Sequence, residues 1–286
     1  MAIYNLYGTQ LSDCFGKDGS PLIEAFDTNG VEIFCKQSII TVMSYNVQKF
    51  GGINAQGAMQ NEIINRYKPD IIGLQELGNV TVLPTVGQNM LSAYSVKQLS
   101  NHNNKLMLAT KGYSLSNLVI ADFQNQDPED MARYNETRAY MKADITIGGK
   151  TVTFINTHLC YLTSSVQYAQ MQELYEIAEN CERVIITGDF NSHQTAIDED
   201  DYLNMYKPFV IAGYHLANNS PESGFTKTYT KASTATSLAD FTTAPDTIIV
   251  SNNIDITNVV FDTTKLSYLN GNAIDHIPVV ATLRLS

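Results

Sequence analysis

The sequence predicts an α/β fold of the α+β type, in which β-sheets pack face to face and helices cover their outer sides. Short apolar and β-branched runs, typical of buried strands, alternate along the chain with amphipathic segments, typical of helices. Some of these strands follow one another directly as hairpins, which a purely parallel, doubly wound sheet does not contain. The length of 286 residues suits one large domain.

The first 36 residues differ from the rest of the chain. CFGKDGSPLI and AFDTNGVEIF are near copies, and the pairs Asp18-Gly19 and Asn29-Gly30 within them are strong hairpin-turn signals. We expect residues 1–36 to form a small β appendage of two hairpin arms, with a plain extension of the main sheet as the alternative. So small a piece buries little apolar surface, and we therefore expect this N-terminal repeat to pack on the main domain or to attach to a larger assembly.

The main domain is expected to span residues 37–286, and its strands are read from apolar runs and alternation. They are expected at 39–45, 71–75, 106–110, 115–121, 139–147, 151–157, 184–187, 246–250 and 278–285. The fifth and sixth of these form a hairpin that turns at Gly148-Gly149. The polar segment 193–245 is expected to contain a helix and long loops, which in a compact enzyme often shape a binding site.

Two amphipathic helices, 55–67 and 164–180, are expected on the outside of the sheets. The first ends before Lys68-Pro69, because proline cannot continue a helix. Their inward faces carry Met59, Ile63 and Tyr67 in the first helix, and Tyr168, Met171, Leu174 and Ala178 in the second.

Composition limits the classes of function. The net charge of −11 argues against non-specific adhesion to nucleic acid, although a divalent metal can still bring a phosphate substrate to an acidic protein. No apolar run approaches the ~18 residues of a membrane span, so no membrane insertion is expected. The N-terminus shows no signal peptide, which favours cytoplasmic synthesis and leaves the final location open, with phage or surface association as one alternative.

The four cysteines, Cys14, Cys35, Cys160 and Cys181, show no metal-ligand spacing. We expect buried free thiols, and a Cys14–Cys35 bridge stays open.

Polar residues with catalytic potential stand at the ends of six expected strands. They are Asn46, Glu76, Asn156 and His158, Asp189 and Asn191, Asp246, and Asp275 with His276. Residues two apart on a strand, such as Asp189 and Asn191, project to the same side, so a buried strand can hold both rigidly at its tip. Gathering this many acids without a cation costs several kcal/mol, and oxygen ligands favour Mg²⁺ or Mn²⁺ over zinc.

Seven motifs in order along the chain carry a resemblance to a known family. SYNVQ, LQEL, ETRAY, NTHL, GDFNS, PDTIIV and IDHIPV resemble those of the endonuclease/exonuclease/phosphatase superfamily, the DNase I-like metal-dependent phosphoesterases. The similarity covers 39–286 and leaves the N-terminal repeat outside. The resemblance implies a four-layer α/β sandwich of two packed mixed β-sheets flanked by helices.

The resemblance also implies a role for each matching residue. The metal side comprises Asn46, Glu76 as the direct ligand, and Asp275. The catalytic side comprises His158, Asp189, Asn191, Asp246 and His276, with His276 as the catalytic histidine oriented by Asp246. Arg138 and Asn156 are expected to bind phosphate. Either Asp189 or the His276–Asp246 pair would take the proton from water, and no covalent intermediate is expected.

Several positions depart from the family pattern. Ile274 stands where serine is common before Asp275, and the residues after Asp246 differ from the usual ones. The segment NHNNKLMLAT offers amides where DNase I has an acid beside its first histidine, so His158 is expected to donate a hydrogen bond rather than to act as a general acid.

Substrate choice stays open among three classes. A nuclease, with DNA favoured, is the leading hypothesis, although no basic stripe for nucleic acid is visible. A sphingomyelinase-like or small-molecule phosphodiesterase or phosphatase is the alternative, and the absence of Trp argues against its membrane-acting form. A non-catalytic binding module comes third, because all seven motifs are present.

Overall fold

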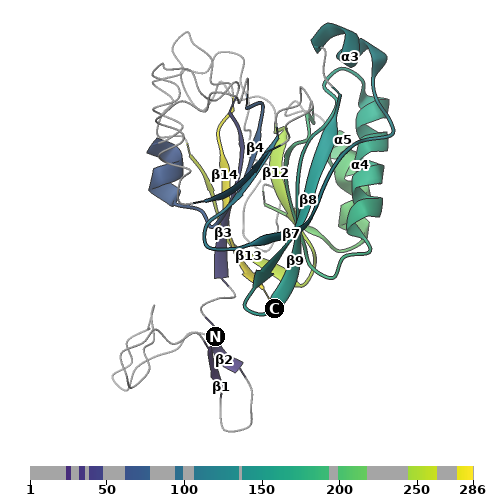
Figure 1. The fold of residues 1–286 in the computed structure, drawn as a ribbon. Coiled ribbons are helices and arrows are strands. Elements are labelled where there is room, and N and C mark those ends of the chain that lie inside the picture. The colour runs from purple at the N-terminus through teal and green to yellow at the C-terminus, as the bar shows by residue number, and fades with distance from the viewer. Residues whose placement is uncertain are drawn as a thin grey trace.

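The computed structural model describes residues 24–26, 32–35, 39–47, 62–77, 94–98, 106–134, 137–192, 199–217, 244–262 and 276–285. Within these ranges the strands form two six-stranded mixed sheets and one two-stranded sheet (Figure 1).

The first sheet has the strand order β13-β14-β3-β4-β6-β5. These strands are β3 Ile39–Asn46, β4 Ile71–Gln75, β5 Ser95–Gln98, β6 Met107–Thr110, β13 Ile254–Phe261 and β14 Val279–Leu285. Only β3 and β4 pair in parallel, so both end at the same edge of the sheet. That edge is at the top of Figure 1.

The second sheet has the order β11-β12-β10-β9-β8-β7. Its strands are β7 Leu115–Asp122, β8 Ala139–Ile147, β9 Lys150–His158, β10 Val184–Asp189, β11 His215–Leu216 and β12 Asp246–Val250. Strands β9 and β10 are the parallel pair of this sheet, and they end at the same edge as β3 and β4. The expected β8–β9 hairpin turns at Gly148 and Gly149, whose φ angles of 57° and 75° suit glycine.

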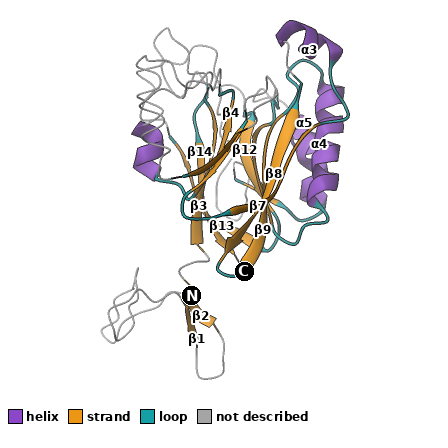
Figure 2. Ribbon diagram, in the orientation of Figure 1, coloured by secondary structure: helices purple, strands orange, loops and turns teal. Residues whose placement is uncertain are grey.

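Helices cover the outer faces of both sheets, which gives the four-layer sandwich (Figure 2). A helix over 62–67 packs Ile63 and Ile64 on the first sheet. Helices α4 Ser164–Ala178 and α5 Glu199–Ile211 cover the second sheet, and a short helix, α3 Pro128–Tyr134, precedes β8. The expected sandwich of two mixed β-sheets flanked by helices is therefore confirmed.

The inward face of α4 differs in part from the prediction. Met171, Leu174 and Ala178 are buried as expected, whereas Tyr168 is 37% exposed. Gln167 takes its place in the buried stripe, because its side chain donates hydrogen bonds to the carbonyls of Cys160 and Asn191.

Each central strand divides its side chains between two cores. On β9, Phe154 packs between the two sheets, and its neighbour Ile155 packs under α4 and α5. On β3, Val42 likewise lies between the sheets, and Met43 faces the helix side. The inward positions are therefore every second residue, and the strand tips continue this alternation into the site.

Four of the described elements differ from the prediction by being additional to it: β5, α3, β11 and β13. At the N-terminus, β1 Glu24–Phe26 pairs in antiparallel with β2 Glu32–Cys35, and the Asn29-Gly30 pair expected to form a turn lies outside the described residues. The Asp18-Gly19 arm, Met59 and Cys14 lie outside the described residues. In the part of the chain that the structure describes, no helix is long and apolar enough to cross a membrane.

Candidate active site

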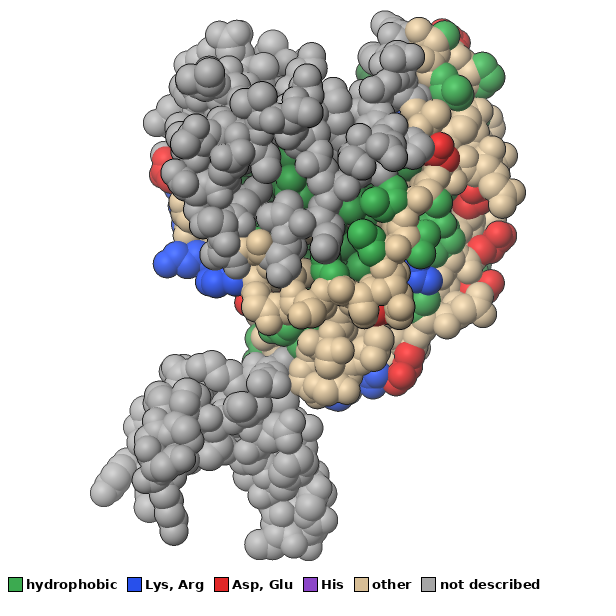
Figure 3. Space-filling model, viewed as in Figure 1, with side chains coloured by type: hydrophobic (Ala, Val, Ile, Leu, Met, Phe, Trp, Pro, Cys, Tyr) green, Lys and Arg blue, Asp and Glu red, His purple; other side chains and the backbone are tan. Residues whose placement is uncertain are grey.

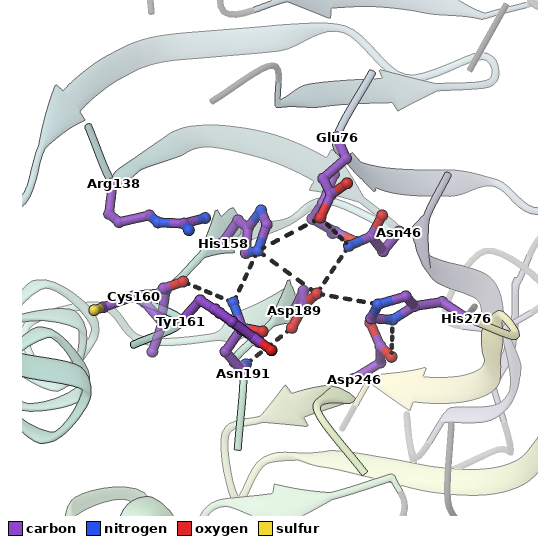
Figure 4. A network of polar contacts seen from close by, with 12 residues as sticks. Asn46, Glu76, Arg138, His158, Cys160, Tyr161, Asp189, Asn191, Asp246 and His276 are labelled. Atoms are coloured by element: carbon purple, nitrogen blue, oxygen red, sulfur yellow. Dashed lines mark hydrogen bonds and ion pairs between the residues drawn. The ribbon is translucent and has the colours of Figure 1, made fainter. Parts of the chain in front are cut away.

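Six polar side chains from both sheets meet where β3, β4, β9 and β10 end (Figure 4). The first sheet contributes Asn46 at the end of β3, Glu76 after β4 and His276 before β14. The second contributes His158 and Asp189, the last residues of β9 and β10, and Asp246, the first residue of β12. Each side chain stands at or next to one end of a buried strand, and the arrangement of these strands brings residues that are distant in sequence together.

Asp189 occupies the centre of the group. Its Oδ2 accepts a hydrogen bond from Asn46 Nδ2 at 2.8 Å, and its Oδ1 accepts one from the backbone N–H of Asn191 at 2.9 Å. The Nε2 atoms of His158 and His276 lie 3.6 and 3.7 Å from the same Oδ2. One fully buried carboxylate thus lies between two imidazoles and is held by donors from both sheets.

His276 forms a buried pair with Asp246. The distance between His276 Nδ1 and Asp246 Oδ2 is 2.7 Å, and both side chains are 1% exposed. A carboxylate can only accept, so Nδ1 carries the proton and Nε2 is the atom directed towards Asp189. The pair joins the two sheets, and it fixes the orientation of the ring that the sequence identified as catalytic.

His158 contacts an amide where His276 contacts a carboxylate. Asn191 Nδ2 donates to the carbonyl oxygen of Leu159 at 2.9 Å, and it lies 2.9 Å from His158 Nε2. Because the carbonyl can only accept, this atom of Asn191 is nitrogen, and His158 Nε2 is the acceptor of its second hydrogen. His158 must therefore gain a proton or turn before it donates to a phosphate, which refines the donor role expected from the sequence.

Two site residues have left-handed backbone conformations. Among the described residues, non-glycine φ angles are positive at Lys68, Glu76, Asn117 and Asn191. Glu76 has φ 56° and Asn191 has φ 49°. This conformation costs roughly 1–2 kcal/mol for a residue such as glutamate, and such costs cluster at functional sites. The turn brings the Glu76 carboxylate to within 3.0 Å of Asn46 Nδ2.

The donor atoms fit a divalent cation. One set comprises Glu76, His158 and Asp189, another comprises Asp189, Asp246 and His276, and the atoms within each set lie within 4.8 Å of one another. The Glu76 side chain is 33% exposed and the others are almost fully buried, so Glu76 faces the side from which an ion can enter. Clustered carboxylates are the ligands that a hard cation prefers. Asp275, the third expected metal-side residue, lies outside the described residues.

Arg138 lies beside the cluster in an ion pair. Its Nε and Nη2 donate to the two carboxylate oxygens of Asp130 in α3, at 2.8 and 3.2 Å. Both side chains are buried, and Figure 4 shows the guanidinium directed towards His158. Asp130 is not predictable as a site residue from the sequence, because an acid in a short polar segment is ordinarily exposed. If Arg138 binds phosphate, it would do so with its ion pair to Asp130 intact.

Asn156 does not point into the cluster, in contrast to the expectation. Its side chain is fully buried between the sheets, donates to the carbonyls of Leu74 and Met107, and accepts from Gln75 and Thr187. All its hydrogen-bonding groups are thus engaged within the protein. The reason is the strand period: Asn156 is two residues before His158, which places it one layer deeper.

Neighbouring ionisable groups are unsuited to nucleophilic roles. Burial raises the pKa of the Cys160 thiol to about 11, and Asp127 lies 3.6 Å from its sulfur. Burial also raises the pKa of Tyr206, with a contribution from the negative charges of Asp246 and Asp189. A protonated thiol is a poor nucleophile, so Cys160 is unsuited to attack a phosphate. Cys160 is a buried free thiol, as expected, whereas Cys181 is free but only half-buried.

The surface seen in Figure 3 carries its charge unevenly. Acidic side chains are most frequent along the right flank of this view, the side on which Figure 1 draws α4, and few basic side chains lie there. This agrees with the net charge of −11.

Comparisons with solved structures show the same fold. The catalytic domain of human nocturnin, with a bound sulfate anion, is 20% identical with a TM-score of 0.62 over 87% of this chain and 95% of that chain. TDP2 of D. rerio, complexed with a single-strand DNA product, is 14% identical with a TM-score of 0.64 over 86% and 99%. A mannosyl-6-phosphatase of Bacteroides thetaiotaomicron is 14% identical with a TM-score of 0.60 over 85% and 99%.

A family model gives the assignment at the level of sequence. Comparison with curated protein sequences finds no match. The model described as the Endonuclease/Exonuclease/phosphatase family matches residues 43–252, which is most of the sandwich and includes Asn46, Glu76, His158, Asp189 and Asp246. With its fold, its strand-end cluster and this match, the chain belongs to the endonuclease/exonuclease/phosphatase family, whose members are metal-dependent phosphoesterases.

Proposed function

We propose that this protein is a divalent-metal-dependent phosphodiester hydrolase, with Mg²⁺ or Mn²⁺ as the metal and nucleic acid as the substrate. Within that class we favour a DNase I-like endonuclease acting on DNA. The observation that carries the proposal is the meeting of three carboxylates, an amide and two imidazoles from two sheets around Asp189. A likeness to a TDP2 structure that holds single-strand DNA product supports the substrate.

Each side chain would serve one requirement of hydrolysis. Glu76, with Asn46 beside it, would hold the cation, and the bound cation would neutralise charge that develops on the phosphoryl oxygens. Asp189 would orient the attacking water in line with the leaving oxygen. The His276–Asp246 pair would take the proton, because Asp246 fixes the Nδ1 proton and directs Nε2 towards Asp189. A turn of His158 would release the second Nδ2 hydrogen of Asn191, and both residues would then donate hydrogen bonds to the phosphate.

A second substrate class is supported by a different observation. One structural neighbour is a mannosyl-6-phosphatase, and this chain carries a net charge of −11. Long nucleic acids bind through many cation–phosphate contacts, whereas a small phosphate ester needs only the metal and a few donors. A small-molecule phosphodiesterase or phosphatase, or a sphingomyelinase-like enzyme, is thus the alternative.

Attachment to a larger assembly through residues 1–36 has no support from the comparisons.

A substrate panel tests the proposal. The full chain is incubated with plasmid, single-stranded DNA, RNA, sphingomyelin, a sugar phosphate and a chromogenic phosphodiester, each with Mg²⁺, Mn²⁺ or EDTA. Nicking of plasmid that EDTA abolishes and that Glu76→Gln also abolishes is the expected result. Hydrolysis of the small esters or of sphingomyelin alone would replace DNA by the alternative substrates. If no substrate is hydrolysed and no metal is bound, the protein would be a binding module.

A further inference from the structure

A hydrogen-bond layer lies directly beneath the site and has no part in the chemistry proposed above. It consists of Gln75, Asn156 and Thr187, which we call the cross-sheet layer, and all three side chains are fully buried between the sheets. Asn156 Oδ1 accepts from Gln75 Nε2 at 2.7 Å and from Thr187 Oγ1 at 3.0 Å. Buried polar groups between apolar sheets are costly unless paired, so this layer is a specific feature of the interface.

Asn156 links the second sheet to two strands of the first. It stands on β9, and its Nδ2 donates to the carbonyl of Leu74 on β4 and to that of Met107 on β6, both at 2.9 Å. Leu74 and Met107 are the last register pair of the β4–β6 ladder. The side-chain amide thus continues that ladder from the opposite sheet and ties three strands together.

The residues of this layer are adjacent in sequence to the catalytic ones. Asn156 precedes His158 by two residues, Thr187 precedes Asp189 by two, and Gln75 directly precedes Glu76. A shift of one sheet against the other at this level would therefore move Glu76 relative to His158 and Asp189. The distance between the two sheets at the site is short, because Asn46 Nδ2 of the first sheet lies 2.8 Å from Asp189 Oδ2 of the second.

The close approach of the sheets here depends on a glycine. A Cβ atom at Gly73 would lie 1.9 Å from Thr187 Oγ1 and 2.6 Å from Asn156 Oδ1. Gly73 occupies the inward position of β4 between Ile71 and Gln75, so any side chain there would occupy the space of the hydrogen bonds. The two sheets thus approach each other closely where the layer joins them.

We propose that Asn156, with Thr187 and Gln75, is a positioning residue: it fixes the distance between the edge of the first sheet that carries Glu76 and Asn46 and the edge of the second sheet that carries His158 and Asp189. This role rests on the proposed function of the site. The layer itself touches neither the substrate nor the metal. It acts by holding Glu76 and Asn46 at a fixed separation from Asp189 and His158.

The test uses four variants of the full chain. Asn156→Leu removes all four hydrogen bonds at similar size. Thr187→Val removes one donor at constant shape, and Thr187→Ser, its matched control, keeps the hydroxyl. Ile155→Val is a second control, because Ile155 packs on the helix side of the same strand. The measurements are kcat and KM, the Tm, and the affinity for Mn²⁺ without substrate, followed by the EPR signal of free Mn²⁺.

Thr187→Val and Asn156→Leu are expected to lower kcat about tenfold or more with KM changed little, because displacing a catalytic group by about 1 Å lowers the rate strongly. Both are also expected to weaken Mn²⁺ binding severalfold. Thr187→Ser should keep both values within about twofold, and Ile155→Val should lower the Tm alone. If Asn156→Leu does not fold, the comparison of Thr187→Val with Thr187→Ser tests the proposal. Equal kcat and equal Mn²⁺ affinity in Thr187→Val and Thr187→Ser would overturn the proposal.

Failure of the proposed function is distinguishable from failure of this inference. A wild-type chain that hydrolyses no phosphoester would remove the function, and the Mn²⁺ affinities would still decide the positioning role. If the wild type also binds no Mn²⁺, crystal structures of Thr187→Val and Thr187→Ser test the positioning role. The Asn46–Asp189 distance should exceed hydrogen-bonding range in Thr187→Val alone, and an unchanged distance in both would overturn the inference.

Discussion

The space between the two sheets has an apolar half and a polar half, and the same strands supply both. On β9 the inward residues are Val152 and Phe154 in the apolar half, then Asn156 and His158 in the polar half. β3 and β10 change in the same way towards the end of each strand. Apolar contacts are non-directional, whereas hydrogen bonds fix distance and angle. The apolar half thus holds the sheets together, and the polar half sets how they are aligned.

This comparison predicts separable effects of mutation. Substitutions in the apolar half should lower the free energy of unfolding and leave the rate of the folded enzyme almost unchanged. Substitutions in the polar half should lower the rate more than the stability. Each experiment below therefore measures both quantities in the same variant.

The largest effect is expected at the catalytic edge of the polar half. His276→Ala should lower kcat by roughly 10²–10⁴, the usual contribution of an acid–base group. The reason is that its Nε2 faces Asp189 while Asp246 holds its Nδ1 proton. Steady-state hydrolysis of the best substrate measures kcat, and thermal unfolding checks that the variant is folded. Turnover close to wild type would remove His276 from the chemistry.

The next effect belongs to the apolar half. Phe154→Ala should lower the free energy of unfolding by about 3–5 kcal/mol, because Phe154 is fully buried in the core between the sheets. Urea unfolding at 15 °C measures this loss. The kcat per folded molecule should stay within about threefold of wild type. A hundredfold lower kcat in the folded variant would show that the two halves are not separable.

Gly73→Ala tests the border between the halves. The new methyl group would overlap the Thr187 hydroxyl, so the sheets must move apart or the hydrogen bonds must break. We expect a loss of about 1–3 kcal/mol in stability, typical of overpacking, together with a lower kcat. Gly149→Ala is a control for glycine substitution outside the sheet, since a Cβ there meets no atom within 4 Å, although its φ of 75° adds local strain. An active and stable Gly73→Ala variant would contradict the close approach.

Much of this organisation could be predicted from the sequence. Asn46, Glu76 and Asp189 stand at the carboxyl ends of expected strands and His276 stands just before the last one, so the sequence identifies all four. Their convergence follows from parallel pairs that end at one edge, which strand periodicity and the family resemblance together imply. The hairpin at Gly148-Gly149 was equally predictable, because its turn residues are specific.

The cross-sheet layer and the ion pair between Arg138 and Asp130 could not be predicted from the sequence. A Thr or Gln inside a strand looks the same in sequence whether it faces a helix or another sheet, and its partner depends on how the sheets pack. The sequence therefore predicts Asn156 at the phosphate, whereas in the structure its side chain lies one layer deeper, between the sheets. Asp130 was missed because α3 is a short polar segment without a clear helical period. Contacts between residues distant in sequence carry no local signal.

The smallest predicted effect comes from polar contacts outside the two sheets. Asp127 accepts hydrogen bonds from the backbone N–H groups of Glu129 and Asp130 at the start of α3. Asp127→Ala should therefore lower the free energy of unfolding at pH 7 by about 1 kcal/mol, as for other lost helix caps. Asp127→Asn should lose less, because asparagine also caps. Urea unfolding measures both, and kcat should stay within about twofold of wild type.

The charge of Asp127 should add a pH dependence to this stability. A hydrogen bond from the Thr163 side chain is the main cause that lowers the pKa of the Asp127 carboxyl below its ordinary 3.8. The folded state then binds this proton less tightly than the unfolded state, so the stabilisation is present above about pH 4 and is lost as the pH falls through the lower, folded value. The stability difference between wild type and Asp127→Asn should thus shrink between pH 7 and pH 3. A constant difference would remove the charge effect, and a large loss of kcat would show that polar contacts outside the space between the sheets also align the site.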